Sequence, residues 1–544
     1  MKKTTILAAI ALMAGAVSAY AQEYLHVNSP IGTSKMYSMD DIDYIGVEEA
    51  TEISERMKAD EKISIFNAAL EATGLGKMLG AGIDYSYDAS KYSYYNYASN
   101  IWKEIAVLPP CKMKGYTLFV ETDEVLKKHG VNNLKDLQTL AKQIYDKTYP
   151  ADAGLYDDDF TNPKNPLYRF VAYHILTTDI RSLDRLTGRR LTYRRINDEE
   201  IGVHSDRMNP IEWYRTLLPN TLMKCERLTM KNWKSETCSL KNYYLNRRWD
   251  DTYQLRGGEV AQPESENSVV NGRYFYVDDI VAFTTDIRDK VQNMLIRMDL
   301  STVFPELTTL DIRQNGNPDW DDYMDVADKT FKNGRNYWFP NGSIEGLKVN
   351  SGKMVYRRPH INFWSSQGDE FNVFGDYDVE ISLPPVPFSG EWQVRLGFCA
   401  LATRGVAQIF FDEVEQGEPI DLRLLLNDAK IMGTNFLSDD DGSYYMSLTD
   451  EEKAEDQKKL KAMGVYRGPR GGYHTNGDTK SEWVGKAQTY RRVLCQVYID
   501  NTAEHILRIK NVGGSTNNEL QLDYIELVPK SVYDVPEGQM ESDL

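Results

Sequence analysis

Histidine and cysteine are scarce in this chain, with 7 and 5 residues among 544. No C-x-x-C, H-E-x-x-H, G-x-S-x-G or G-x-x-x-x-G-K-[ST] pattern occurs, so the sequence carries none of the redox, zinc-protease, serine-hydrolase or nucleotide-binding signatures. The acidic loops at 156–160 and 438–445 do not fit the spacing of a calcium-binding EF-hand. The sequence therefore predicts no catalytic residue, no metal and no cofactor.

An excess of basic charge and long apolar runs are also missing. The formal net charge is −18, and such an acidic chain repels the phosphate backbone of nucleic acids. After the first 21 residues there is no window of 18 continuous apolar residues. We therefore expect neither nucleic acid as a partner nor insertion of the mature chain into a membrane.

The first 21 residues have the pattern of a bacterial secretory signal. Lys2 and Lys3 form a basic start, an apolar stretch follows at 6–17, and Ala19-Tyr20-Ala21 offers a cleavage site. This pattern predicts export, to the periplasm, the outer surface or the medium. Export permits disulfides, and Cys225 and Cys238 are close enough in sequence to form one, although an odd number of cysteines leaves at least one thiol unpaired.

The next part of the chain alternates helical and strand patterns. Residues 22–53 predict a short N-terminal β element, and 61–80 predict a helix that buries Ile65, Phe66, Ala69 and Leu70. The stretch 115–130 starts as a strand and continues as a helix, with Thr122 as its N-cap. Apolar residues at helical spacing predict a further helix after residue 131.

The order of these motifs resembles the fasciclin (FAS1) domain over residues 54–284. The matching residues are Tyr116, Thr117, Phe119, Thr122, Asp123, Glu124, the Tyr173-His174 pair, Asn271-Gly272 and Val277-Asp278. Glu121 departs from the family pattern, which has proline there, and insertions at 83–112, 146–166 and 229–266 lengthen the domain. The resemblance implies an α+β fold in which the Tyr-His motif serves structural integrity and adhesion.

From residue 346 onward, apolar residues alternate with polar ones between turns rich in Gly, Pro and Asp. This period of two predicts an all-β antiparallel sandwich over 346–531, interrupted by a surface helix at 449–464. The final strand pattern resembles jelly-roll, galactose-binding-like modules. Residues 285–345 are expected to form a connector and 532–544 a polar tail. The expected fold is thus an α+β fasciclin-like domain followed by a jelly-roll-like sandwich.

His174 lies in the apolar run 168–176, and three roles are open to it. A general base needs a nucleophile or carboxylate partner, and a metal ligand needs neighbouring histidines at a suitable spacing. The sequence shows neither, so we expect a buried, hydrogen-bonded residue that completes the fold. The resemblance leaves Tyr173 and His174 as candidates for an adhesive contact.

Two further groups of residues are candidates for ligand contact. An insertion carries the aromatic residues Tyr92, Tyr94, Tyr95, Tyr97 and Trp102, which suit sugar stacking or protein contacts but equally suit packing against their own domain. Asn517 and Asn518 precede the last strand of the sandwich, where galactose-binding-like modules place an amide that contacts sugar hydroxyls. Asparagine is also a common turn former, which explains both positions without a ligand.

These observations favour a non-enzymatic, exported protein that binds a glycan or a cell-surface partner. Two alternatives remain open. With 81 acidic residues, a glycoside-processing enzyme is conceivable, because sequence does not give the separation of two carboxylates. A structural subunit of an outer-membrane complex is the second alternative.

Overall fold

The computed structural model describes residues 24–28 and 34–38 and, between 52 and 541, all residues except 81, 99–102, 110, 181, 188–191, 195–199, 203–210, 232–237, 250–254, 262–268, 270, 314–335, 358–364, 367–368, 432–444, 446, 470–472, 477–478, 483–484, 515–517 and 537. The chain divides into two compact units, residues 1–49 and 50–544. In the first unit, where a short β element was expected, β1 (Tyr24–Asn28) and β2 (Ser34–Ser38) form an antiparallel pair. The expected signal peptide, 1–21, lies outside the described residues.

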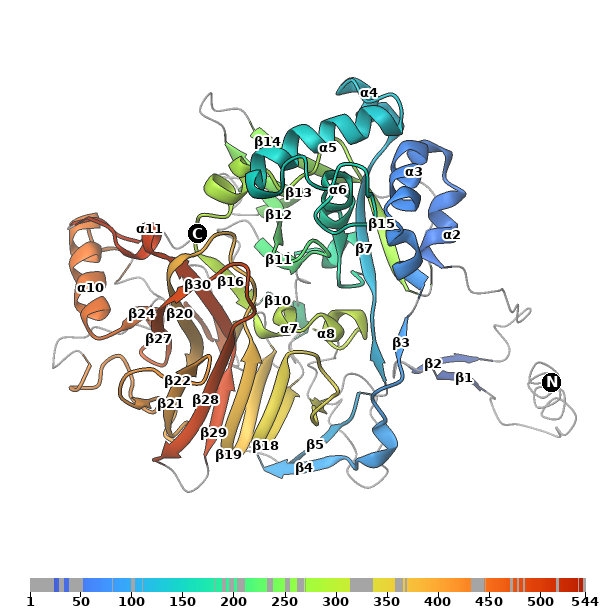
Figure 1. Ribbon diagram of the computed structural model, residues 1–544. Coiled ribbons are helices and arrows are strands. Elements are labelled where there is room, and N and C mark those ends of the chain that lie inside the picture. The colour runs from blue at the N-terminus through green and yellow to red at the C-terminus, as the bar shows by residue number, and fades with distance from the viewer. Residues whose placement is uncertain are drawn as a thin grey trace, which may run out of the picture. The chain divides into compact units, whose positions relative to one another are not determined.

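A seven-stranded sheet organises the first part of the second unit (Figure 1). In spatial order its strands are β11 (Ile211–Arg215), β12 (Leu222–Lys231), β13 (Cys238–Trp249), β14 (Leu255–Ala261), β15 (Gly272–Val277), β7 (Tyr116–Glu121) and β8 (Ile175–Leu176). All six residues of β7 are buried, as expected for an inner strand covered on both faces. β7 and β15 run parallel, and the other neighbours in this sheet run antiparallel.

The Asn271-Gly272 motif has a local physical reason. A Cβ atom on Gly272 would lie 2.3 Å from the carbonyl oxygen of Tyr116, so only glycine lets β15 approach β7 at this point. The side-chain oxygen of Asn271 accepts a hydrogen bond from the backbone N–H of Ile53 at 3.0 Å. The motif therefore joins the parallel strand pair to the first helix of this unit.

Five helices pack beside the sheet (Figure 1). They are α2 (Ile53–Lys58), α3 (Ser64–Ala72), α4 (Asp123–Lys128), α5 (Leu134–Thr148) and α6 (Pro166–Tyr173). α3 buries the four apolar residues expected from its sequence, and Thr122 caps α4 by accepting from the Val125 N–H. Asn133 and Asn165 cap α5 and α6 in the same way, which fixes where each helix begins. Short 3-10 turns lie at η2 (Glu61–Ile63), η3 (Leu75–Gly80), η4 (Ala89–Lys91), η5 (Pro150–Asp152) and η6 (Leu183–Arg185).

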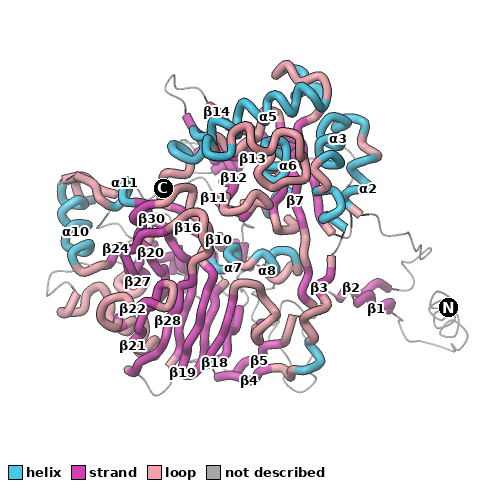
Figure 2. The backbone as a smooth tube through the Cα atoms, in the orientation of Figure 1, coloured by secondary structure: helices cyan, strands magenta, loops and turns pink. Residues whose placement is uncertain are grey.

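The second part of this unit is rich in strands, which form sandwich-like sheets (Figure 2). One sheet has the order β16 (Ile296–Asp299), β30 (Tyr524–Pro529), β20 (Gly390–Cys399), β27 (Thr489–Ile499) and β24 (Val465–Arg467). The main path of the other is β22 (Val414–Glu415), β21 (Val406–Phe411), β28 (Ile506–Gly513), β19 (Glu370–Ser382), β18 (Leu347–Arg357), β17 (Asn336–Trp338), β5 (Lys103–Val107) and β4 (Tyr95–Ala98). β23 (Ile420–Asp421) pairs with β21, and β29 (Glu519–Leu522) pairs with β19.

Smaller elements complete the described fold. Two-stranded pairs are β3 (Ile83–Asp84) with β6 (Lys112–Met113), β9 (Thr192–Arg194) with β10 (Glu200–Gly202), and β25 (Tyr473–Asn476) with β26 (Thr479–Glu482). The remaining helical elements are the π-turn η7 (Ile287–Val291), α7 (Leu300–Val303), α8 (Pro305–Thr309), α10 (Asp450–Ala462) and α11 (Lys530–Tyr533). α10 is the surface helix expected at 449–464, and Thr449 with Glu452 forms its capping box.

Residues 285–345 contribute strands to both sheets of the sandwich. β16 adds an edge strand to the five-stranded sheet through β30, and β17 pairs with β18 in the larger sheet. The insertion at 83–112 likewise joins the larger sheet, because β5 pairs parallel with β17 and β4 pairs with β5. Residues on both sides of position 284 thus share sheets, and the structure does not separate them into independent units.

The cysteines form no disulfide among the described residues. Cys225 is a buried free thiol on β12. In the pairing of β12 with β13, Cys225 lies opposite Leu245, whereas Cys238 lies opposite Lys231 at the other end of β12. The alternative of a Cys225–Cys238 bridge is therefore wrong. Cys495 is buried.

Candidate functional site

A cavity of about 520 Å³ opens in the sandwich beside the end of β20. It is lined by Ala400, Leu401, Ala402, Asp421, Arg423, Leu424, Leu425, Lys430 and Gln488. These residues come from three places: the loop after β20, the end of β23 with the segment that follows it, and the turn before β27. We call this cavity the sandwich pocket.

Backbone hydrogen bonds fix the walls of the sandwich pocket. The N–H of Ala400 donates to the carbonyl of Gln488, and the N–H of Leu426 donates to the carbonyl of Ala487, both at 2.9 Å. The hydroxyl of Tyr490 donates to the carbonyl of Leu424 at 2.8 Å. The lining loops are thus held to strand β27, so the pocket has a defined shape before any ligand enters.

Asp421 and Arg423 form the charged pair of the sandwich pocket. The guanidinium donates from Nε to Oδ1 at 2.8 Å and from Nη2 to Oδ2 at 2.7 Å. These hydrogen bonds lower the pKa of the Asp421 carboxyl, which is therefore ionised at neutral pH. Nη1 of Arg423 also donates to the carbonyl of Gly514 at 2.5 Å, which ties the pair to the loop before β29.

Two further polar groups of the pocket have no such internal partner. Among the described residues, neither the ammonium of Lys430 nor the side-chain amide of Gln488 takes part in a hydrogen bond or an ion pair. Lys430 is exposed, and Gln488 is half-buried. Alanine and leucine side chains supply the apolar wall. The pocket therefore combines open hydrogen-bonding groups with an apolar surface, the usual composition of a small-ligand site.

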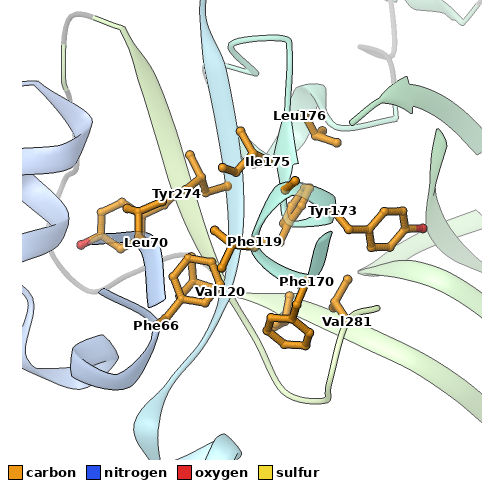
Figure 3. Packing of buried hydrophobic residues seen from close by; sticks show 14 of the residues in the cluster. Phe66, Leu70, Phe119, Val120, Phe170, Tyr173, Ile175, Leu176, Tyr274 and Val281 are labelled. Atoms are coloured by element: carbon orange, nitrogen blue, oxygen red, sulfur yellow. The ribbon is translucent and has the colours of Figure 1, made fainter. Parts of the chain in front are cut away.

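The structure places the Tyr-His motif in the core. Tyr173 and His174 are both fully buried, and burial raises the pKa of the Tyr173 hydroxyl. That hydroxyl donates to the carbonyl of Leu222 at 3.1 Å and accepts from Asn246 at 3.0 Å. Figure 3 shows Tyr173 among Phe119, Phe170 and other apolar side chains. In this conformation neither side chain of the motif is accessible to another protein or a ligand.

His174 uses both of its ring nitrogens inside the protein. Nδ1 lies 2.7 Å from the carbonyl of Phe170, and since a carbonyl only accepts, Nδ1 carries a proton. Nε2 lies 2.9 Å from Oε1 of Glu121, which also accepts from the N–H of Val281 at 2.9 Å. The rings of Phe66 and Phe170 pack against the imidazole. The expectation of a buried, hydrogen-bonded histidine is confirmed.

The tyrosine insertion packs mainly against the larger sheet of the sandwich. Tyr92 and Tyr95 contact the ring of Trp338 on β17, with ring centroids 5.8 and 6.4 Å apart, and Tyr97 contacts Phe374 at 4.7 Å. Tyr97 is buried, whereas Tyr92 and Tyr94 are 38% and 45% exposed. Trp102 lies outside the described residues. The cluster therefore covers strands β17 and β19 of the sandwich.

Asn518, which directly precedes β29, does not line the sandwich pocket. Asn518 accepts at its backbone carbonyl from Gly375 at 2.9 Å, and its side-chain oxygen is buried without a hydrogen-bond partner among the described residues. Asn517 lies outside the described residues. Gly514 contacts the pocket through its carbonyl, which accepts a hydrogen bond from Arg423.

Sequence reasoning missed the residues that line the sandwich pocket, and it also missed Glu121 as the partner of His174. The departure of Glu121 from the proline of the fasciclin pattern was the available signal, because a carboxylate in a fully buried strand requires a partner. The lining of the pocket gave no such signal.

Among the residues that the structure describes, no group of three or more His, Cys, Asp or Glu side chains is arranged to hold a metal ion. None of the described helices is long and apolar enough to cross a membrane.

Comparisons with known proteins give only weak likenesses. No family model matches this chain, and no curated protein matches it. Among solved structures, a Paenibacillus xanthan lyase matches at 16% identity with a TM-score of 0.18, covering 34% of this chain and 12% of that one. A family 35 carbohydrate-binding module from Clostridium thermocellum matches at 12% identity and 0.17, covering 34% of this chain and 92% of the module.

A second module of that type, CBM35 from Paenibacillus barcinonensis, matches at 11% identity and 0.17, with coverage of 36% and 98%. The chain thus spans about an eighth of the lyase and nearly all of each module. At these identities and TM-scores the likenesses assign neither an activity nor a ligand to this chain.

Proposed function

We propose that this protein is an exported, non-enzymatic binding protein that takes a glycan into the sandwich pocket. The observation that carries the proposal is the pair of open polar groups, Lys430 and Gln488, beside an apolar wall. A sugar ring presents hydroxyls around its edge and C–H groups on its faces. Such a ligand can hydrogen-bond to both side chains while one face packs against Leu401 or Leu424.

The charges in the pocket favour binding over glycoside hydrolysis. Hydrolysis requires two carboxyl groups on either side of the scissile bond, one of them protonated. Asp421 is the one carboxylate among the residues that line the pocket, and Arg423 keeps it ionised. Asp421 is thus suited to accept hydrogen bonds from sugar hydroxyls and unsuited to donate a proton.

Residues 54–284 are, in this proposal, a fasciclin-like unit that contacts a cell-surface partner. Its support is the order of elements: α3, β7, α4, α5, α6 and finally β15, which returns to lie parallel to β7. The residues that carry the resemblance occupy defined places in this order, such as Thr122 at the cap of α4 and Gly272 at the contact with β7. The signal-like pattern of residues 1–21 supports export to the periplasm, the outer surface or the medium.

The test is a glycan array probed with the mature chain, 22–544, followed by calorimetric titration of the strongest ligand. Lys430→Ala and Gln488→Ala should each weaken binding roughly 10-fold, the usual effect of removing a hydrogen bond to a ligand. Lys459→Ala is the matched control, because Lys459 is an exposed lysine on α10 outside the pocket.

Three results would overturn the proposal. Binding that both pocket variants retain would place the glycan site elsewhere. Release of reducing ends from the bound polysaccharide would make the protein an enzyme. No glycan binding by folded protein, together with co-purification of an outer-membrane partner, would favour the structural-subunit alternative.

A further inference from the structure

Three buried carboxyl groups that the proposed function does not use lie together beside the end of β16. They belong to Asp299, Asp369 and Asp523, and each residue is at most 6% exposed. The three come from segments that are distant in sequence: the end of β16, the position before β19 and the link between β29 and β30. Carboxylates are costly to bury, and neighbouring ones raise that cost for each other.

The strand pairings bring the three carboxyl groups to one place. Asp299 lies opposite Tyr524, the residue after Asp523, in the pairing of β16 with β30. Leu522, the residue before Asp523, lies opposite Phe371 in the pairing of β29 with β19. The third carboxyl group belongs to the residue that directly precedes β19. The fold itself therefore gathers these acids.

The carboxyl group of Asp299 is only half satisfied by hydrogen bonds. Its Oδ1 accepts from the backbone N–H of Ser301 at 2.9 Å and from the hydroxyl of the same residue at 2.5 Å. Its Oδ2 is buried and has no hydrogen-bond partner among the described residues. An ionised carboxylate with one unsatisfied oxygen is costly inside a protein, and protonation removes the charge.

Charged groups on the neighbouring elements act on this centre in both directions. Burial raises the pKa of Asp299 to about 6, Arg313 opposes this shift, and Glu212 on β11 reinforces it. Burial also raises the pKa of Asp369 and Asp523 well above the usual range, and the nearby first carboxyl adds to both shifts. The other titratable or charged groups around the centre are Tyr214 of β11, Tyr356 of β18, Glu370 of β19 with its partner Arg357, and Tyr524 of β30.

The acidic centre lies at one end of a segment that contacts both parts of the fold. We call residues 299–313 the junction segment; it contains α7 and α8 (Figure 1). The N–H of Leu300 donates to the carbonyl of Asp523 in the sandwich at 3.0 Å. The hydroxyl of Thr309 accepts from the N–H of Asp179, which follows β8 of the seven-stranded sheet, at 3.1 Å. At the end of the junction segment, the guanidinium of the last residue donates to the carboxylate on β11 at 2.8 Å.

We propose that the three carboxyl groups form a pH-sensitive latch, which holds the junction segment against both parts of the fold in mildly acidic solution and loosens when the carboxyls ionise. A raised pKa means that the closed form binds its protons more tightly than an opened form whose carboxyls face water. The stability of the closed form is therefore highest below about pH 4 and falls as the pH rises through about 6. The latch shares no residue with the sandwich pocket, so the inference is independent of the proposed function.

The experiment is hydrogen exchange of the mature chain, 22–544, measured by mass spectrometry at pH 5 and pH 8 and corrected for the intrinsic exchange rate at each pH. For Asp299 alone, a pKa of about 6 against 3.8 in water makes opening roughly 10-fold easier at pH 8 than at pH 5. Peptides from 296–310 should therefore lose at least about 10-fold in protection. Peptides from α5, which is remote in sequence from the junction segment, should not show this loss.

A charge-removing variant separates the latch from other effects of pH. Asp299→Asn keeps the size of the side chain but cannot ionise. At pH 8 it should retain most of the protection that the unmodified chain shows at pH 5. Asp158→Asn, at an exposed position, is the matched control and should exchange like the unmodified chain.

Four results would overturn the proposal. The first is equal protection of 296–310 at pH 5 and pH 8 in the unmodified chain, a comparison that decides the matter even if Asp299→Asn fails to fold. The second is higher protection at pH 8 than at pH 5. The third is an equal loss in the α5 peptides, which would indicate global destabilisation. The fourth is an unchanged pH dependence in folded Asp299→Asn, which would assign the effect to other groups.

Discussion

The seven-stranded sheet and the sandwich each contain a polar centre, and the two centres differ in how completely they are satisfied from within. The Glu121–His174 pair is fully buried, and both imidazole nitrogens have partners in the protein. The sandwich pocket is open, and among the described residues neither the Lys430 ammonium nor the Gln488 amide takes part in a hydrogen bond or an ion pair. Histidine and glutamate are the residue types used in catalysis, yet here they hold strands and helices together. The proposal of a site rests on polar groups that the fold does not use and that a ligand can reach, whereas the Glu121 carboxylate is closed off from solvent.

The largest expected effect comes from breaking the buried Glu121–His174 pair. His174→Ala should lower the free energy of unfolding by about 3–5 kcal/mol, since it leaves Glu121 buried without its partner. Urea denaturation measures this change. His129→Ala is the control, because His129 is partly exposed and pairs with Asp279 near the surface. Unchanged stability together with loss of partner binding would show instead that the Tyr-His motif acts as a contact site.

Truncation of a buried ring in the tyrosine insertion should have the next largest effect. Tyr97→Ala removes a buried aromatic side chain that packs on Phe374, and we expect a loss of about 3 kcal/mol in the free energy of unfolding. Tyr94→Ala, at a side chain that is 45% exposed, should cost less than about 0.5 kcal/mol. If Tyr94→Ala instead abolished glycan binding at unchanged stability, the insertion would be part of the glycan-binding site.

A third effect concerns pH, through the buried acid Asp299 at the end of β16. Burial raises the pKa of its carboxyl to about 6, and Arg313 partly opposes this shift. Asp369 and Asp523 also interact with Asp299, and burial raises the pKa of each well above its usual range. A raised pKa means that the folded state holds the proton more tightly than the unfolded chain does. Stability should therefore fall as the pH rises from about 4 through about 6.

Asp299→Asn should remove that part of the pH dependence and raise the free energy of unfolding at pH 7 by on the order of 2 kcal/mol. Thermal unfolding between pH 4 and pH 8 measures it, with Asp158→Asn at an exposed position as the control. A steeper loss of stability with rising pH in Asp299→Asn would contradict this account.

Local sequence signals predicted β7 and the helices near it, but not strands β8 and β11 to β14 of the same sheet. Thr122 caps a helix, the apolar positions of α3 are buried, and Gly272 stands where a side chain has no room, because each of these features depends on a few neighbouring residues. The period of two likewise predicted the strands of the sandwich, and 449–464 its surface helix.

Features that depend on distant contacts were not predictable. β16 and β17 are too short to show a pattern, and they become strands because β30 and β18 offer free edges to them. The sandwich pocket joins residues near 400, 421–430 and 488, none of which forms a motif by itself. The C-terminal segment shows the same limitation, since a polar sequence gave no sign that Glu541 pairs with the buried Arg395.

The most direct test of the central claim is a calorimetric titration of the strongest array glycan into the mature chain and into Lys430→Ala, with the unfolding temperature of both proteins measured in parallel. The account predicts that affinity falls roughly 10-fold while the unfolding temperature changes little, because the exposed ammonium makes no hydrogen bond or ion pair among the described residues. Equal affinity for both proteins, or an equal loss of affinity in Lys459→Ala, would contradict it.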